Sequence, residues 1–255
     1  MSVEPENLAE GTLISHLLEL RSRLIRALVA VGICFIPCAY YSNQIFSFIA
    51  KPLLDKLPKG GALIATGVMT PFTTPFKLSF FVALFVAMPY VLYQVWAFVG
   101  PGLYRREKRF AVPLMLSSVV LFYAGVIFAY VVVFPMVFAF FTSTTPQGVS
   151  MMTDITSYMD FALTMFLAFG IAFEVPVAVV LLVLTGIIKL EKLKANRGYV
   201  LIAIFIIAAI LTPPDALSQC VMAVPMYLLY EGGVLMAQIM QRMQRTAAER
   251  DAAKI

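Results

Sequence analysis

Six long apolar runs divide the chain, and each is interrupted by few polar positions. They lie near residues 24–41, 75–99, 111–141, 157–186, 198–212 and 216–240. A helix of about 20 apolar residues is long enough to cross the hydrocarbon core of a bilayer. The pattern therefore predicts an all-α polytopic membrane protein with six transmembrane helices.

The fifth run is unusually short. Arg197 and the pair Pro213-Pro214 leave about fifteen residues of helix between them, or roughly 22 Å, against a hydrocarbon core of about 30 Å. Such a span must thin the bilayer locally. Because two prolines cannot extend a helix, while Asp215 and Ser218 suit the start of the next one, residues 211–218 are expected to form a tight external hairpin.

Two further segments between the runs are predicted to lie on the external side. Residues 42–74 carry several prolines and glycines, including Pro52, among apolar positions, which favours an ordered cap over a loose loop. Residues 142–156 form the second segment. No internal repeat is visible, so residues 1–240 are expected to form one membrane domain, followed by a disordered cytoplasmic tail over residues 241–255.

The distribution of charge predicts the orientation of the chain. Charged residues make up only 13% of it, about half of the roughly 25% found in soluble domains, and the net charge is +5. Most basic residues fall in alternate loops, near residues 21–26, 105–109, 189–197 and 242–254. Because basic residues resist translocation, both termini are predicted to be cytoplasmic. Short scattered clusters of this kind argue against a nucleic-acid interface.

Residues 1–15 contain three glutamates but no lysine or arginine. A secretory signal peptide would start with a basic stretch, so the first apolar run is predicted to be a retained span. The three cysteines all lie inside apolar runs and are interpreted as small buried hydrophobes.

Glu174, in the segment Phe173-Glu174-Val175-Pro176, is the clearest ionisable residue inside an apolar run. A carboxylate in hydrocarbon usually faces a partner or a wet cavity, and the nearby proline frees a backbone carbonyl. A transport role and a purely structural, hydrogen-bonded glutamate both fit this pattern. Glu231 and Asp160 lie nearer the ends of their runs, where interfacial solvation or capping explains them.

Glu19 and Glu107 are single carboxylates within basic clusters of the predicted cytoplasmic face. One interpretation is local ion pairing, since Glu19 and Arg23 are spaced i,i+4 on a helix. The other is that the two acids bind guanidinium groups of a partner peptide, which would demand arginine rather than lysine. An apolar groove beside such a site is predicted from Leu20, Trp96, Phe98 and Leu103.

Enzymatic function is not predicted. His16 is the only histidine, and no metal-binding histidine pair, serine-nucleophile motif or phosphate-binding glycine loop is present. We interpret His16 as a cap or interface residue, and the sequence implies no metal or other cofactor. Asp160 and Asp215 lie at the ends of runs and do not form the intramembrane pair of an aspartyl protease.

Five segments in order along the chain resemble TatC, the large subunit of the twin-arginine translocase. They are HLLELRSRL at 16–24, YQVWAF at 93–98, PGLYRREKR at 101–109, FEVP at 173–176 and LTPPD at 211–215. The likeness extends over residues 7–240. It implies a cup-shaped bundle of six spans in the bacterial cytoplasmic membrane.

The resemblance also implies a function and its residues. The family recognises signal peptides with two consecutive arginines and exports folded proteins, using the proton motive force and no ATP. Its partners are the single-span subunits TatA and TatB, and it assembles as a homo-oligomer within the complex, in membrane lipid. The signal-peptide site falls on Glu19, Leu20, Arg21, Phe98, Leu103, Tyr104, Arg105 and Glu107. The transport or concave face falls on Glu174, Pro52 and Asp215.

A small-molecule carrier or channel is the alternative from another class. A carrier gathers ionisable residues near the midplane on broken, repeated helices. Here the unusual acids lie at the predicted cytoplasmic surface, which favours a peptide receptor.

Overall fold

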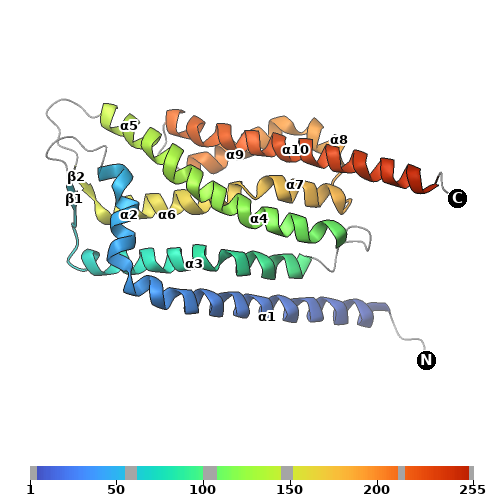
Figure 1. Cartoon of the computed structure of the whole chain (residues 1–255), viewed down its shortest axis with the longest axis horizontal. Coiled ribbons are helices and arrows are strands. Elements are labelled where there is room, and N and C mark those ends of the chain that lie inside the picture. The colour runs from blue at the N-terminus through green and yellow to red at the C-terminus, as the bar shows by residue number, and fades with distance from the viewer. Residues whose placement is uncertain (1–4, 55–61, 100–107, 145–151, 212–215, 253–255) are drawn as a thin grey trace. The chain divides into compact units, whose positions relative to one another are not determined.

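The computed structural model describes residues 5–54, 62–99, 108–144, 152–211 and 216–252, nearly all of them helical (Figure 1). The chain forms two compact units. The first contains Met1–Phe46 and Pro75–Met115, and the second contains Ser47–Thr74 and Leu116–Ile255.

The first unit is built from α1 (Pro5–Tyr40), most of α3 (Thr70–Val99) and the start of α4 (Lys108–Phe128). α1 and α3 contact each other through apolar side chains. Their contact is centred on the buried residues Val31, Cys38, Ala83 and Ala87. The Ser79 hydroxyl lies 3.1 Å from the Cys38 carbonyl oxygen of α1 and 2.8 Å from the Pro75 carbonyl oxygen, so it links the two helices.

The second unit holds most of the remaining elements. Its further helices are α5 (Phe134–Thr144), α6 (Ile155–Ala172), α7 (Val175–Leu184), α8 (Leu190–Ala195), α9 (Arg197–Leu211) and α10 (Ala216–Ala252), and it also contains most of α2 (Ser42–Leu54). Its core is rich in aromatic side chains, and the ring centroids of Phe134 and Phe166 lie 4.9 Å apart. α10 packs against α7 and α9.

Five described stretches are long and apolar enough to cross a membrane: Ile14–Tyr40, Thr70–Val99, Val112–Thr144, Ile155–Leu184 and Gln219–Met243. They confirm five of the six predicted runs as helices. The predicted short helix is also present, as the 15 residues of α9. A membrane crossing by α9, and with it the count of six spans, stays a prediction.

Two of the long stretches are not uniform α-helices. Between α6 and α7, the amide of Glu174 donates to the Ile171 carbonyl at 3.0 Å, and the regular pattern resumes with Ala178 donating to Glu174 at 2.9 Å. Pro176 has no amide hydrogen and cannot donate to the preceding turn, which explains the interruption. Between α4 and α5, Ala129–Val133 forms a π-helical turn that the sequence pattern did not predict.

The predicted external segments contain two short strands, β1 (Ala62–Ile64) and β2 (Met152–Asp154), which pair in parallel. Asp154 caps α6 by accepting hydrogen bonds from the amides of Thr156 and Ser157, each at 3.1 Å. It also accepts a 2.8 Å bond from the Thr66 hydroxyl. This hydroxyl bond and the Ser157 amide lower the pKa of Asp154. Asp154, not Asp160, therefore caps this helix.

The C-terminal end differs from the sequence-based expectation. A disordered tail was predicted over residues 241–255, but α10 continues as a helix to Ala252. The physical reason is local composition, because residues 241–252 consist mainly of good helix formers such as Ala, Arg, Gln and Glu, without Gly or Pro.

Two adjacent glycines of α10 provide a matched test of the packing against α7. A Cβ atom on Gly233 would lie 2.7 Å from the Pro176 Cα atom, whereas one on Gly232 would meet nothing within 4 Å. We expect Gly233→Ala to destabilise the protein by about 1–3 kcal/mol through overpacking. Gly232→Ala should be neutral or slightly stabilising, because alanine favours helix. Thermal unfolding in detergent measures both, and equal melting temperatures for the two variants would contradict this packing.

Candidate functional site

Glu19 lies on α1, with its side chain 36% exposed, and is held by Arg23 one turn later. The Oε1 atom of Glu19 accepts two hydrogen bonds from this guanidinium, from Nε at 2.9 Å and from Nη2 at 2.5 Å. The predicted i,i+4 pair is therefore confirmed. The other oxygen, Oε2, lies 4.0 Å from Nδ1 of His16.

Contacts with α3 hold this part of α1 in place. The His16 ring stacks on Phe98 with centroids 4.2 Å apart and an angle of 19° between the planes. The Nη1 atom of Arg23 also lies 3.4 Å from Oε1 of Gln94, a polar side chain that is buried in an apolar helix. His16 thus lies between Phe98 of α3 and the Glu19 carboxylate of α1. This position is at an interface between two helices, one of the two roles expected for His16.

Leu20 and Arg21 are exposed on α1. Arg21 lies two residues from Glu19 and so points away from it on the helix surface. It lines a shallow hollow of about 370 Å³ with Leu18, Ser22, Ile25 and Arg26. Arg23, rather than Arg21, is therefore the arginine that contacts the acid.

Several predicted site residues lie outside the described part of the chain. These are Leu103, Tyr104, Arg105 and Glu107 of the expected peptide site, and Asp215 of the expected hairpin. Their roles stay predictions.

Glu174 lies at the interruption between α6 and α7. One of its carboxyl oxygens, Oε1, is buried and has no hydrogen-bond partner among the described residues. The side chain is hydrogen-bonded to Ser118, a fully buried residue of α4. Buried polar atoms are nearly always paired, so this oxygen is an exception among the residues that the structure describes.

Pro52 lies in α2, and the structure suggests why a proline suits this position. A proline at residue 52 has no amide hydrogen for the Phe48 carbonyl one turn earlier. The Tyr130 hydroxyl from the π-helical turn donates to that carbonyl at 2.9 Å, and its ring stacks on Phe48. The Tyr158 hydroxyl of α6 donates to the next carbonyl, that of Ile49, at 2.7 Å.

This arrangement predicts coupling between residues 52 and 130. Tyr130→Phe should weaken the attachment of α2 by about 1 kcal/mol, because the Phe48 carbonyl loses its donor. In a Pro52→Ala background the loss should be smaller, since the alanine amide can supply the missing hydrogen. Amide hydrogen exchange of α2 measures both effects. Tyr199→Phe, at a 76% exposed position, is the control, and additive effects of the two changes would contradict the coupling.

Sequence reasoning missed Gln94, Ser118, Tyr130 and Tyr158 as contributors. The only available signal was a polar or hydroxyl-bearing side chain within an apolar run. That signal marks many positions here and does not identify their partners.

Comparison with known proteins gives consistent results. The family model described as "Sec-independent protein translocase protein (TatC)" matches residues 15–225. The chain is 53% identical to the TatC protein of Haemophilus influenzae over 90% of each chain, and 47% identical to that of Escherichia coli K12 over 89% of this chain and 88% of the relative. A crystal structure of the "Twin Arginine Translocase Receptor- TatC" matches with a TM-score of 0.79 and 35% identity, covering 88% of this chain and 98% of that one.

Proposed function

The chain belongs to the TatC family of Sec-independent protein translocases, and from this we propose that Glu19 and Glu107 bind the arginine pair of a signal peptide. The protein is a multi-spanning membrane subunit of the twin-arginine translocase and acts as its receptor.

The proposal for Glu19 rests on the different contacts of its two carboxyl oxygens. Arg23 occupies Oε1, while Oε2 lies 4.0 Å from the His16 ring and accepts no hydrogen bond from the residues that the structure describes. Because Arg23 already fixes the Glu19 side chain, the second oxygen is ready to accept a hydrogen bond from an incoming guanidinium. The side chain then loses little further rotamer freedom when the peptide binds. The contacts of Arg23 with Gln94 and of His16 with Phe98 support the same orientation.

Glu107 is proposed as the second acid, with Arg105, Leu103 and Tyr104 beside it. Leu20 and Phe98 supply apolar surface near the first acid, which suits a peptide that is basic and then hydrophobic. Arg21 is proposed to contribute to the electrostatic balance of this surface rather than to hold Glu19.

The wider assembly is also part of the proposal. The alternation of basic loops supports six spans with both termini in the cytoplasm of a bacterium. TatA and TatB are the proposed partners, further copies of the chain complete the complex, and the proton motive force drives transport. Glu174, Pro52 and Asp215 are proposed to serve transport, and no catalytic reaction is assigned.

Site-specific photo-crosslinking in membranes tests this function. Crosslinkers placed at Leu20 and at Leu103 should capture a precursor that carries a twin-arginine signal peptide. The same crosslinker at Thr66, in the predicted external segment, is the matched control. Capture from Thr66 but from neither of the other two positions would reverse the proposed orientation and refute the site.

A further inference from the structure

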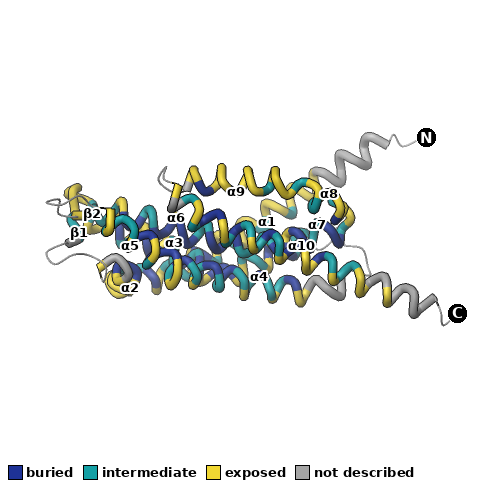
Figure 2. Tube along the Cα trace, turned by 90° about the horizontal axis from the view of Figure 1, so that it is seen from above, coloured by how far each residue is buried: buried dark blue, intermediate teal, exposed yellow. Residues whose placement is uncertain are grey.

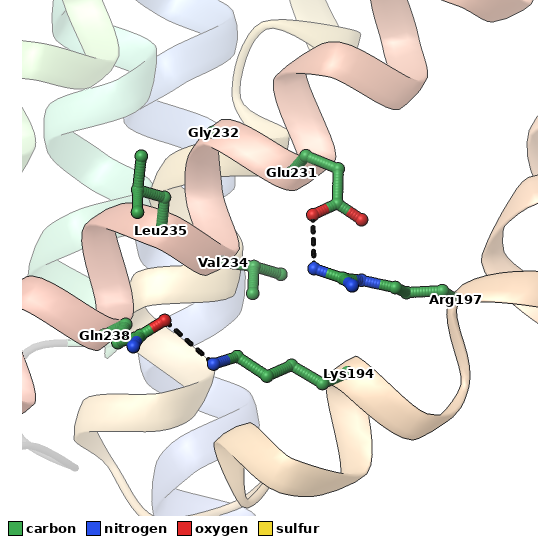
Figure 3. A pocket seen from close by; sticks show the side chains of 7 residues that line it. All are labelled: Lys194, Arg197, Glu231, Gly232, Val234, Leu235 and Gln238. Carbon is green, nitrogen blue, oxygen red and sulfur yellow. Dashed lines mark hydrogen bonds and ion pairs between the residues drawn. The ribbon is translucent and has the colours of Figure 1, made fainter.

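A hollow of about 390 Å³ lies where α8 and the start of α9 meet α10 (Figure 3). Its lining combines two basic side chains, two other polar or charged ones and an apolar floor. The residues are Lys194, Arg197, Glu231, Gly232, Val234, Leu235 and Gln238. All belong to the second unit, and none has been given a role in signal-peptide recognition or transport.

The polar side chains form two separate pairs across the hollow. Arg197 donates from Nη2 to Oε2 of Glu231 at 2.7 Å, and Lys194 donates from Nζ to Oε1 of Gln238 at 2.8 Å. Figure 3 shows both basic side chains reaching from the same side toward α10, with Val234 between the two pairs. Each cation keeps further N–H donors, because guanidinium carries five and ammonium three.

Glu231 does not cancel this positive character. Its Oε2 atom is occupied by Arg197, and its Oε1 atom accepts a 3.0 Å hydrogen bond from the Tyr227 hydroxyl. Two cations against one carboxylate, which already accepts a hydrogen bond at each oxygen, leave a net charge of about +1. The carboxylate therefore orients Arg197 at the hollow, which Arg197 and Lys194 both line.

The surroundings of the hollow are those of a membrane interface. Leu235, which lines it, is 59% exposed, Leu201 lies one turn after Arg197 on the same face of α9 and is 39% exposed, and α9 is exposed along most of its length (Figure 2). Tyr199 is 76% exposed near the start of α9, where an interfacial aromatic is expected. The inference rests on the proposed crossing of the membrane by α9, because a span of only 15 residues brings its basic end closer to the hydrocarbon than a full-length span would.

From this combination we propose that the hollow binds the phosphate group of an anionic membrane phospholipid. Arg197 and Lys194 donate to the phosphate oxygens from the two rims, and an acyl chain lies along Leu235 and the adjacent Leu201. A free phosphate ion would use the basic rims only, whereas a lipid uses both the rims and the apolar surface. The bound lipid would stabilise the bilayer where the short helix thins it.

The test is lipid binding to the purified full-length protein in detergent, measured by native mass spectrometry with phosphatidylglycerol and with phosphatidylcholine. The salt concentration is about 0.5 M, so that diffuse attraction is screened beyond roughly 4–5 Å. Lys194→Gln should weaken phosphatidylglycerol binding about fivefold, and Lys194→Gln with Arg197→Gln about thirtyfold. Phosphatidylcholine should bind more weakly and change little.

Lys192→Gln is the matched control, because Lys192 is exposed on α8 and does not line the hollow. Its phosphatidylglycerol affinity should stay within about twofold of wild type. Lys194→Gln keeps the Arg197–Glu231 pair, so it tests the site even if loss of Arg197 impairs folding. Equal losses for the two lysine variants, no loss for Lys194→Gln, or displacement of the lipid by millimolar inorganic phosphate would overturn the proposal.

Discussion

Glu107→Gln is expected to weaken binding of a twin-arginine signal peptide by about 1.5–3 kcal/mol, or roughly 10- to 150-fold in dissociation constant. Glutamine keeps the size of the side chain but loses the charge that strengthens a hydrogen bond to guanidinium. Glu19→Gln should also weaken peptide binding, because it removes the charge of the first acid and leaves Arg23 without its ion-pair partner.

The measurement is a fluorescence titration of a labelled signal peptide with the purified protein. Glu191→Gln is the control, because Glu191 is an exposed acid at the start of α8 and changes the net charge by the same amount. An affinity for the Glu107→Gln variant equal to that of the control would remove Glu107 from the site.

Glu174→Ala is expected to abolish most transport while leaving signal-peptide binding within about twofold of wild type. The expected effect on stability is small or favourable, because alanine removes a buried carboxyl oxygen that lacks a partner among the described residues. For a purely structural glutamate we expect the opposite, a lower melting temperature with transport per folded molecule unchanged.

Three readouts separate these two roles of Glu174: export of a folded reporter, peptide affinity and thermal unfolding. Ser118→Ala serves as the matched variant, since it removes the hydrogen bond to Glu174 but keeps the carboxyl group. It should retain most transport. A destabilised Glu174→Ala protein with normal transport per folded molecule would restore the structural role.

The helices of this fold could be predicted from the sequence because lipid imposes a simple rule on them. A spanning segment must be apolar and internally hydrogen-bonded, so runs of hydrophobic residues identify it. The short length of α9 could be predicted in the same way, from the positions of Arg197 and Pro213. The pairing of β1 with β2 and the π-helical turn could not be predicted, because strands of three residues and one extra residue in a turn leave no periodic pattern.

For the candidate site, local geometry was predictable and long-range contacts were not. The pair Glu19–Arg23 follows from the i,i+4 spacing of a helix. The contacts of Arg23 with Gln94 and of His16 with Phe98 join positions more than 70 residues apart. Only the packing of α1 against α3 brings those side chains together.

The central claim is that fixed carboxylates recognise guanidinium geometry in a signal peptide. The most direct test compares the affinities of an arginine-pair peptide and a lysine-pair peptide for the wild-type protein and for the Glu19→Gln, Glu107→Gln double variant. We predict that the wild-type protein prefers the arginine peptide at least about tenfold, because lysine cannot bind bidentately, and that the variant loses this preference. Equal binding of the two peptides by the wild-type protein would contradict it.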